Sequence, residues 1–374
     1  MKFRVLCLCL SLTLCIPARA AENPPENAAR AALLLHGETG TVLYENNADE
    51  FLPIASTTKI MTALVVLERC DLADRVEILP EYTGVEGSGM RFRAGDVFTV
   101  EELLYGLMLQ SGNDAAVALA CHTAGSEAAF AELMNEKAAA LGLTSTHYAN
   151  PHGLDAEGHG STARELGLLA AEAMRSETFR AIVSTERKSI GTQTYVNHNR
   201  LLRTYPGAVG VKTGYTMAAG RILVSCARRE DTELICVTIS DPDDWADHEA
   251  LLDWGFENFE YRVVSGAAYP LPVFTGEASA CVLLPEAAPA LLLERGEDTT
   301  LRAELPRFVF APVRQGQPLG RLTLTAGDGQ SVTVPLRAAG DVAADVRAPL
   351  THWERFCRFW QLTGRAVFSF NPTF

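Results

Sequence analysis

Residues 53–68 read PIASTTKIMTALVVLE, and this stretch predicts the centre of the fold. From residue 56 onward, apolar side chains cover nearly every face of the predicted helix, and such a helix is buried in the middle of a domain. Ser56 and Lys59 stand three positions apart at its start, so the Lys59 amine can reach the Ser56 hydroxyl. Because a lysine in so apolar a helix is poorly solvated, its pKa is lowered and it can act as a base toward a serine.

Two further motifs follow later in the chain. A Ser-Gly-Asn triplet at residues 111–113 falls between two predicted helices, residues 99–109 and 114–123, and is therefore expected in a loop. A Lys-Thr-Gly triplet at residues 212–214 ends a predicted strand. Taken singly, the three motifs read more simply as a helix cap, a turn and a strand end. Together they supply a nucleophile, its base, a proton shuttle and a carboxylate anchor, which predicts a serine acyl-transfer site without histidine.

The sequences around the motifs resemble the low-molecular-mass penicillin-binding proteins, and among them the D-alanyl-D-alanine carboxypeptidases. PIASTTKIMTA (53–63) resembles the nucleophile segment of that family, LMLQSGNDAA (107–116) its second motif, and KTGYT (212–216) its third. NPHGLD (150–155) with GHGSTAR (158–164) is a further stretch typical of it. The resemblance covers roughly residues 30–256 and implies a β-lactamase/transpeptidase-like fold.

The resemblance also implies roles for the polar residues of the first two motifs. Ser56 is expected to be the acyl-ester nucleophile and Lys59 its general base. Ser111 is expected to relay a proton to the leaving amine. Asn113 is expected to hydrogen-bond the substrate amide and to fix Lys59.

The third motif is expected to bind the substrate. Lys212 and Thr213 offer a cation and a hydroxyl that suit a terminal carboxylate, and Lys212 is also a second cation that lowers the pKa of Lys59. Gly214 lets a substrate backbone lie close to the strand, as in strand addition. The resemblance places the oxyanion hole at the backbone N–H groups of Ser56 and Tyr215.

The expected activity is that of an exported serine-type D-Ala-D-Ala carboxypeptidase acting in cell-wall biogenesis and remodelling. Ser56 attacks the penultimate D-Ala carbonyl of a peptidoglycan stem peptide, D-alanine leaves, and water hydrolyses the acyl-enzyme. β-Lactams acylate the same serine, and no cofactor is needed. A β-lactamase, a cross-link endopeptidase and a non-catalytic wall-binding protein remain as alternatives. The stem peptide and a vegetative or sporulation role stay open.

One departure from the family pattern concerns the carboxylate anchor. Many members carry an arginine shortly before the Lys-Thr-Gly strand or some way after it. In the later region this chain reads DWADH (244–248), which contains no arginine. Arg200 or Arg203, upstream of Lys212, is the expected substitute.

Composition and the N-terminus indicate an exported protein. The 374 residues suit about two domains, and a formal net charge of −14 excludes the basic face that nucleic acid requires. Lys2 and Arg4 precede an apolar run over residues 5–16, and Ala18-Arg19-Ala20 fits a cleavage site. Residues 1–20 therefore read as a signal peptide, which predicts the outer face of the cytoplasmic membrane or the cell envelope.

The remaining chain is expected to form an α+β domain, an all-β domain and a tail. Residues 21–262 would be the catalytic domain, an antiparallel sheet covered by a helical cluster. Residues 263–347 contain period-two stretches around the turn GDG (327–329) and predict a small β-sandwich. Residues 348–374 alternate aromatic and basic positions with helical spacing, which indicates an amphipathic helix on an anionic membrane. A helix docked on the β domain is the alternative.

The spacing of the cysteines and histidines does not predict a metal site. No CxxC spacing occurs, and His152 and His159 do not have the spacing of a helical ligand pair. Because Cys226 and Cys236 lie in apolar strands, buried free thiols are the preferred reading. A Cys226–Cys236 disulfide across a hairpin remains possible.

Overall fold

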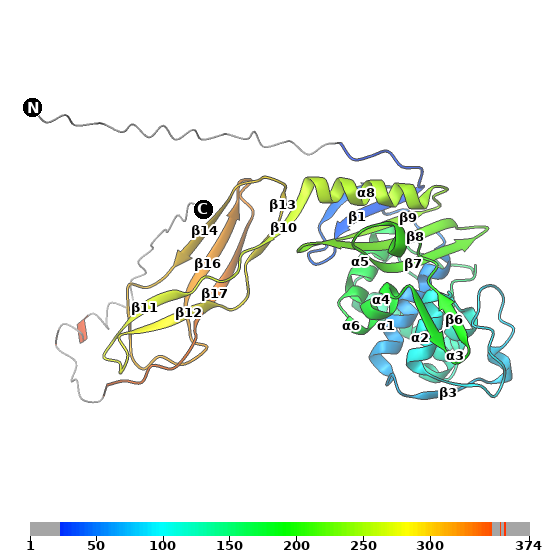
Figure 1. Cartoon of the computed structure of the whole chain (residues 1–374), viewed down its shortest axis with the longest axis horizontal. Helices are drawn as coiled ribbons and strands as arrows, with labels where there is room; N and C mark the ends of the chain where they lie inside the picture. Colours follow the sequence, from blue (N-terminus) through cyan, green and yellow to red (C-terminus); the bar gives the residue numbers. More distant parts are fainter. Residues whose placement is uncertain (1–22, 346–351, 353–354, 357–374) are drawn as a thin grey trace, which may run out of the picture. The chain divides into compact units, whose positions relative to one another are not determined.

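The computed structural model describes residues 23–345, 352 and 355–356, and these fall into two compact units (Figure 1). The first unit, residues 23–263, mixes helices and strands. The second begins at residue 264 and is built of strands up to residue 345. Each unit has its own hydrophobic core.

The first unit is organised around a five-stranded antiparallel sheet with the order β2-β1-β9-β8-β7. Its strands are β1 (Ala31–His36), β2 (Val42–Asn46), β7 (Ala208–Thr216), β8 (Gly220–Arg229) and β9 (Thr232–Ile239). This confirms the antiparallel sheet predicted from the sequence, including the strand that carries the Lys-Thr-Gly triplet and the two that carry Cys226 and Cys236. β7, which carries the Lys-Thr-Gly triplet, is an edge strand, so one side of its backbone is open to another segment.

Helices cover both faces of this sheet because the strands are apolar on both sides. In β1, Leu33 and Leu35 join the larger core, whereas Leu34 points into a smaller core on the opposite face. The larger core is formed with α1 (Lys59–Arg69), α2 (Val100–Leu109), α3 (Asn113–Ala124), α4 (Glu127–Ala140), α5 (Ala163–Met174) and α6 (Glu177–Ser184). The smaller core is formed with α7 (Leu201–Thr204) and α8 (Asp244–Asn258).

Short elements complete the first unit. They are the 3-10 helices η1 (Ala55–Thr58) and η2 (Pro80–Tyr82), and the strands β3 (Arg75–Glu77), β4 (Val97–Thr99), β5 (Arg187–Ile190), β6 (Gln193–Val196) and β10 (Phe259–Val263). Helix α2 begins with a capping box, in which Glu102 N donates to Thr99 Oγ1 at 3.1 Å and Thr99 N donates to Glu102 Oε2 at 2.8 Å.

The helix predicted from residue 56 is divided in two. Residues 55–58 form η1, and the α-helix starts at Lys59. The division arises from the side-chain hydroxyls, because Thr57 Oγ1 donates to the Ile54 carbonyl and Thr58 Oγ1 to the Ala55 carbonyl. These local bonds compete with the α-helical ladder and favour the tighter turn.

The second unit is all-β in residues 264–345. A six-stranded sheet has the order β14-β16-β17-β12-β11-β15, with β15 parallel to β11 and the other pairs antiparallel. Its strands are β11 (Tyr269–Phe274), β12 (Ala280–Pro285), β14 (Thr299–Glu304), β15 (Val309–Phe310), β16 (Pro318–Ala326) and β17 (Ser331–Ala338), and β13 (Ala290–Glu294) lies outside this order. The hairpin predicted at residues 327–329 is confirmed between β16 and β17.

Two predictions concern the tail and the cysteines. Of the predicted amphipathic helix at residues 348–374, only residues 352, 355 and 356 are described, so the helix as a whole lies outside the described residues. Within the described part of the chain, no helix is long and apolar enough to span a membrane. The prediction that Cys226 and Cys236 are buried free thiols is confirmed, and the alternative disulfide is not formed. Cys226 joins the larger core and Cys236 the smaller one, on opposite faces of the sheet.

Two fully buried histidines, His36 and His248, are expected to make the first unit less stable at acidic pH. Burial lowers the pKa of His36 to about 4 and that of His248 to about 3, from 6.5 in the unfolded chain. Below pH 6.5 the unfolded chain therefore binds protons that the folded chain does not. We expect the free energy of unfolding to fall by roughly 1 kcal/mol per pH unit for each histidine as the pH drops from 6.5 toward 4.

Urea unfolding followed by tryptophan fluorescence at a series of pH values measures this effect. His248 lies between Ser225 Oγ, 2.6 Å from its Nδ1, and Thr238 Oγ1, 3.1 Å from its Nε2. His248→Gln can keep hydrogen bonds to these hydroxyls without titrating, so it should show a shallower pH slope. A free energy that stays level between pH 6.5 and 5 would contradict the prediction.

Candidate active site

Ser56 lies in the middle of η1, on a turn that the surrounding residues hold in place. The preceding residue, Ala55, is buried and has a φ of 45°, in the left-handed region that a non-glycine residue rarely adopts. Strain of this kind persists only where neighbouring contacts impose it. Here the Thr58 hydroxyl donates to the Ala55 carbonyl at 2.8 Å, and this hydrogen bond stabilises the turn that presents Ser56.

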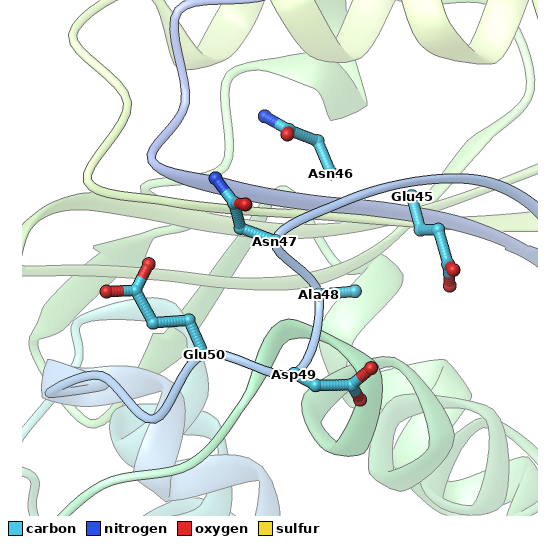
Figure 2. Close-up of a pocket in the computed structure, with 6 residues that line it drawn as sticks. All are labelled: Glu45, Asn46, Asn47, Ala48, Asp49 and Glu50. Carbon is cyan, nitrogen blue, oxygen red and sulfur yellow. The ribbon is translucent and has the colours of Figure 1, made fainter.

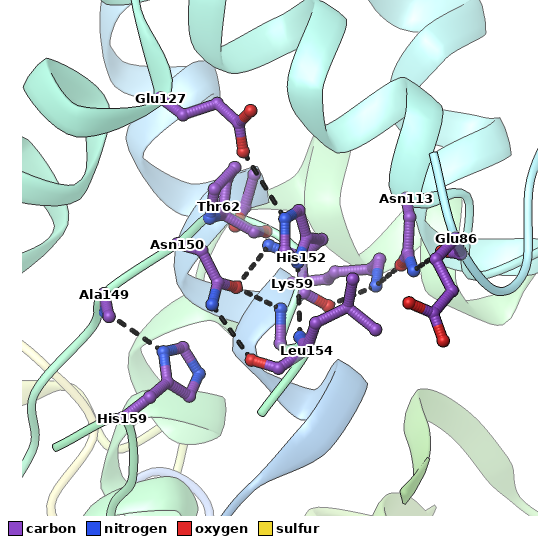
Figure 3. A network of polar contacts seen from close by, with 12 residues as sticks. Lys59, Thr62, Glu86, Asn113, Glu127, Ala149, Asn150, His152, Leu154 and His159 are labelled. Atoms are coloured by element: carbon purple, nitrogen blue, oxygen red, sulfur yellow. Dashed lines mark hydrogen bonds and ion pairs between the residues drawn. The ribbon is translucent and has the colours of Figure 1, made fainter. Parts of the chain in front are cut away.

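Lys59 is fully buried and touches three oxygen atoms. Its Nζ lies 2.9 Å from Ser56 Oγ. The same atom lies 2.7 Å from Asn113 Oδ1 and 2.5 Å from the His152 carbonyl (Figure 3). The amide and backbone oxygens can only accept hydrogen bonds, so they take two of the amine's N–H groups. In a neutral amine the remaining position is a lone pair, and it faces the Ser56 hydroxyl.

The surroundings of Lys59 favour that neutral form. Burial lowers the pKa of Lys59 well below its ordinary value, and the charge of Lys212 lowers it further, against an opposing effect of Asp114. The prediction that burial and Lys212 together depress this pKa is in accord with the geometry.

Ser111 and Lys212 form the second pair. Lys212 is buried, and its Nζ lies 3.0 Å from Ser111 Oγ and donates to the Thr213 carbonyl at 2.8 Å. Burial lowers the pKa of Lys212 to about 7, so near neutral pH it exists in both protonation states. Ser111 has a φ of 58°, a strained backbone that turns its side chain toward β7 rather than continuing α2.

Asn113, the first residue of α3, connects Lys59 to a loop that the sequence did not point to. Its Nδ2 donates to the Glu86 carbonyl at 2.6 Å, and its backbone N donates to the Ser88 carbonyl at 2.7 Å. Asp114 accepts from the backbone N–H groups of Met90 and Arg91, each at 2.9 Å. Asn113 and Asp114 therefore hold the loop over residues 86–91 in place by hydrogen bonds to its backbone, and this loop forms one wall of the site.

The loop over residues 150–154 forms the opposite wall (Figure 3). Asn150 holds it by accepting from Gly153 N at 2.7 Å and donating to the Leu154 carbonyl at 2.9 Å. His152 supplies its carbonyl to Lys59, while its ring Nε2 lies 3.4 Å from Glu127 Oε2. The family-like stretch thus contributes a backbone oxygen, which no side-chain motif could reveal.

His159 stabilises the turn that presents Ser56 through a hydrogen bond to Thr58. Its Nδ1 accepts from Ala149 N at 3.0 Å, so the ring proton sits on Nε2, which lies 2.8 Å from Thr58 Oγ1. Burial, reinforced by neighbouring His152 and His147, lowers the pKa of His159 to about 4 and keeps the ring neutral. Both ring nitrogens are occupied by protein groups. Within the described residues no cluster of His, Cys, Asp and Glu is suited to hold a metal ion.

Gly214 brings strand β7 against the Ser56 turn. A Cβ at this position would lie 3.3 Å from the Ile54 carbonyl oxygen and 3.3 Å from Ser56 N. A side chain at this position would be tight against η1, so the glycine favours the close approach of β7 to η1. Tyr215 follows on the same edge strand with a 63% exposed side chain.

The structure gives contacts for both arginines that were expected to join the carboxylate anchor. The Arg200 guanidinium lies 5.9 Å from the ring centroid of Trp245, beside α8 on the other face of the sheet. Arg203 Nη1 donates to the Asn197 carbonyl at 3.3 Å.

A surface hollow along residues 45–50 lies apart from these groups (Figure 2). It contains none of the predicted site residues. Two of its carboxylates are already paired, since Arg164 contacts Glu45 at 2.6 Å and Asp49 at 2.7 Å. The hollow offers no comparable set of reactive groups.

Comparisons with known proteins show the family to which this chain belongs. The D-alanyl-D-alanine carboxypeptidase family, peptidase S11, matches residues 18–243. D-alanyl-D-alanine carboxypeptidase DacF of Bacillus subtilis is 33% identical over 333 residues, covering 84% of this chain and 86% of that protein. DacC of Escherichia coli is 36% identical over 328 residues, covering 82% of each.

Solved structures give the same result. Penicillin-binding protein 5 of Haemophilus influenzae superposes with a TM-score of 0.68 at 29% identity, covering 86% of this chain and 99% of that one. The match extends through both units, and the predicted mixed α/β fold with an additional β domain is confirmed in outline. The chain therefore belongs to the D-alanyl-D-alanine carboxypeptidase family of serine peptidases.

Proposed function

We propose that this chain removes the terminal D-alanine from peptidoglycan stem peptides that end in D-Ala-D-Ala, and that β-lactams acylate the same serine. One observation carries the proposal above all: the buried Lys59 amine lies 2.9 Å from Ser56 Oγ while two acceptor-only oxygens occupy its other positions. A neutral lysine in this setting is a base aimed at a serine hydroxyl.

The reaction begins with proton transfer from Ser56 Oγ to Lys59 as Oγ attacks the carbonyl carbon of the penultimate D-Ala. The backbone N–H groups of Ser56 and Tyr215 stabilise the oxyanion that develops on the carbonyl oxygen. The C–N bond to the terminal residue breaks, its nitrogen takes a proton through Ser111, and D-alanine leaves. Water then attacks the ester, Lys59 takes its proton, and Ser56 regains its hydrogen.

The edge strand β7 binds the substrate in this scheme. Its open backbone edge is available for strand addition by the peptide. Lys212 and Thr213 hold the terminal carboxylate. A bound carboxylate favours the protonated form of Lys212, whose pKa burial lowers to about 7. Asn113 orients Lys59 and hydrogen-bonds the substrate amide.

We also propose the cellular setting that the sequence predicts. Residues 1–20 act as a signal peptide, and residues 21–262 work at the outer face of the cytoplasmic membrane, in the cell envelope. Residues 263–347 form a β-sandwich that serves as a scaffold. The amphipathic tail over residues 348–374 makes peripheral membrane contact.

Ser56→Ala tests the proposed function. The mature protein and the variant are incubated with a fluorescent penicillin, and separately with an N-acylated peptide that ends in D-Ala-D-Ala. We expect persistent labelling and D-alanine release from the wild type, and loss of both in the variant, because only the hydroxyl is removed. Rapid penicillin turnover without peptide cleavage would identify a β-lactamase instead, and absence of labelling would indicate a binding protein.

A further inference from the structure

We propose that Asp155 selects among stem peptides by binding a positively charged side chain on the residue that precedes D-Ala-D-Ala. The inference rests on the proposed function, because it uses the binding of the peptide along the open edge of β7. The substrate class that it names is peptides with a free side-chain amine at that position.

Asp155 is bonded directly to the strand that carries the Lys-Thr-Gly triplet. Thr216, the last residue of β7, contacts Asp155 Oδ1 through its hydroxyl at 2.8 Å, and the same hydroxyl oxygen accepts from Ala219 N at 3.0 Å. Because an ionised carboxylate can only accept, the hydroxyl is the donor in the bond to Asp155. One oxygen of the carboxylate is therefore held at the end of β7.

Asp155 lies on the face of β7 that also carries a reactive group of the site. Side chains of a strand alternate between its two faces, and Lys212, Gly214 and Thr216 stand two residues apart in a regular pairing with β8. On this face Lys212 Nζ lies 3.0 Å from Ser111 Oγ. Thr216, and with it Asp155, therefore lies on the face of the Ser111–Lys212 pair, further along the strand.

The direction of the bound peptide brings an earlier residue of the substrate to this end of β7. In the proposed reaction the terminal carboxylate lies at Lys212 and Thr213 and the reacting carbonyl at the backbone N–H of Tyr215, so the peptide runs antiparallel to β7. An extended chain advances by about 3.4 Å per residue. The residue before the penultimate D-Ala therefore comes to lie beside Thr216, to which Asp155 is bonded.

The chemistry of Asp155 favours a cationic partner. The residue is exposed, and the Thr216 hydroxyl binds only one of its two carboxylate oxygens. A carboxylate accepts hydrogen bonds and cannot donate them, and it binds positively charged donors more strongly than neutral ones. A side-chain amine that has been converted to an amide carries no charge. Asp155 therefore favours stem peptides whose side-chain amine is free over those in which it is acylated.

The experiment measures D-alanine release by the mature protein from two N-acylated Lys-D-Ala-D-Ala peptides that differ only in acetylation of the lysine side-chain amine. For the wild type we expect kcat/KM to be about fivefold higher with the free amine, which is the size of effect that an exposed charge pair produces. Asp155→Asn keeps an oxygen that can accept from Thr216 but removes the charge, so the ratio should fall close to one. The wild-type ratio should also shrink as salt is raised, because exposed charges are screened.

Glu157→Gln is the matched control, because Glu157 is also exposed and stands two residues further along the same loop, and it should keep the wild-type ratio. The inference would be overturned by a wild type that does not distinguish the peptides, by an equal loss for both in Asp155→Asn, or by the same selective loss in Glu157→Gln. Failure of the proposed function differs, since the wild type would then release D-alanine from neither peptide. Thermal unfolding of each variant shows that the protein tested is folded.

Discussion

Lys59→Ala is expected to lower the rate of Ser56 acylation by about four orders of magnitude, both by penicillin and by the peptide. The substitution removes the base 2.9 Å from Ser56 Oγ and leaves the serine hydroxyl with no proton acceptor of comparable strength. Stopped-flow or gel-based labelling with a fluorescent penicillin measures the acylation rate directly. Because Lys59 is fully buried and its charged form is poorly solvated there, the loss of the amine is expected to leave the fold intact.

Two controls separate the base from other roles of this lysine. Lys137→Ala removes a partly buried α4 lysine that pairs with Glu68, away from the motifs, and it should label normally. Lys59→Arg keeps a cation and its donors but cannot lose a proton at ordinary pH, so it should fail like alanine. Normal labelling of folded Lys59→Ala would refute the assignment. Normal labelling of Lys59→Arg would mean that Lys59 serves as a cation and not as a base.

Gly153→Ala is expected to destabilise the protein by about 3–5 kcal/mol and to abolish activity in the fraction that still folds. Gly153 has a φ of 88°, and a Cβ there would lie 1.9 Å from the Ala55 carbonyl oxygen. That oxygen belongs to the turn that presents Ser56, and it accepts the Thr58 hydroxyl. Relief of the overlap must therefore displace either the turn or the loop that supplies the His152 carbonyl to Lys59.

Gly158→Ala is the matched control in the same stretch. Gly158 also has a positive φ, 74°, but the atom nearest to its added Cβ is His147 Nδ1 at 3.8 Å. Gly158→Ala therefore introduces the backbone strain without the steric overlap, and it should lower the free energy of unfolding by about 1 kcal/mol. Chemical unfolding and penicillin labelling of both variants provide the comparison. Equal losses in the two would show that strain at positive φ is responsible and that contact with the nucleophile turn is not.

Much of the site could be predicted from the sequence because several of its contacts join residues only a few positions apart, or residues that belong to recognisable motifs. The Ser56–Lys59 contact spans three positions, and the capping box of α2 spans three. The burial of Lys59 follows from the apolar residues after it. Contacts of this range depend on few neighbours, so a short stretch of sequence determines them.

Other elements were missed because their sequence signal is weak. Helix α8 begins at Asp244 after an N-cap residue that makes no side-chain cap bond, and charged residues fill its first turn. Strands β5 and β6 form a mostly exposed two-stranded ribbon without apolar alternation. Their stability comes from the larger structure on which they pack, which no local pattern records.

The sequence by itself determined the reactive residue types, their order, the antiparallel sheet and the core helix that holds Lys59. Only the tertiary structure decided how the Lys59 amine is directed, because two of its partners, Asn113 and the His152 carbonyl, stand 54 and 93 residues away. It likewise placed His159, 101 residues from Thr58, beneath the nucleophile turn, and turned Arg200 toward Trp245. A backbone carbonyl carries no residue-specific signal, and the direction of a side chain depends on packing between distant segments, so neither can be read before the chain has folded.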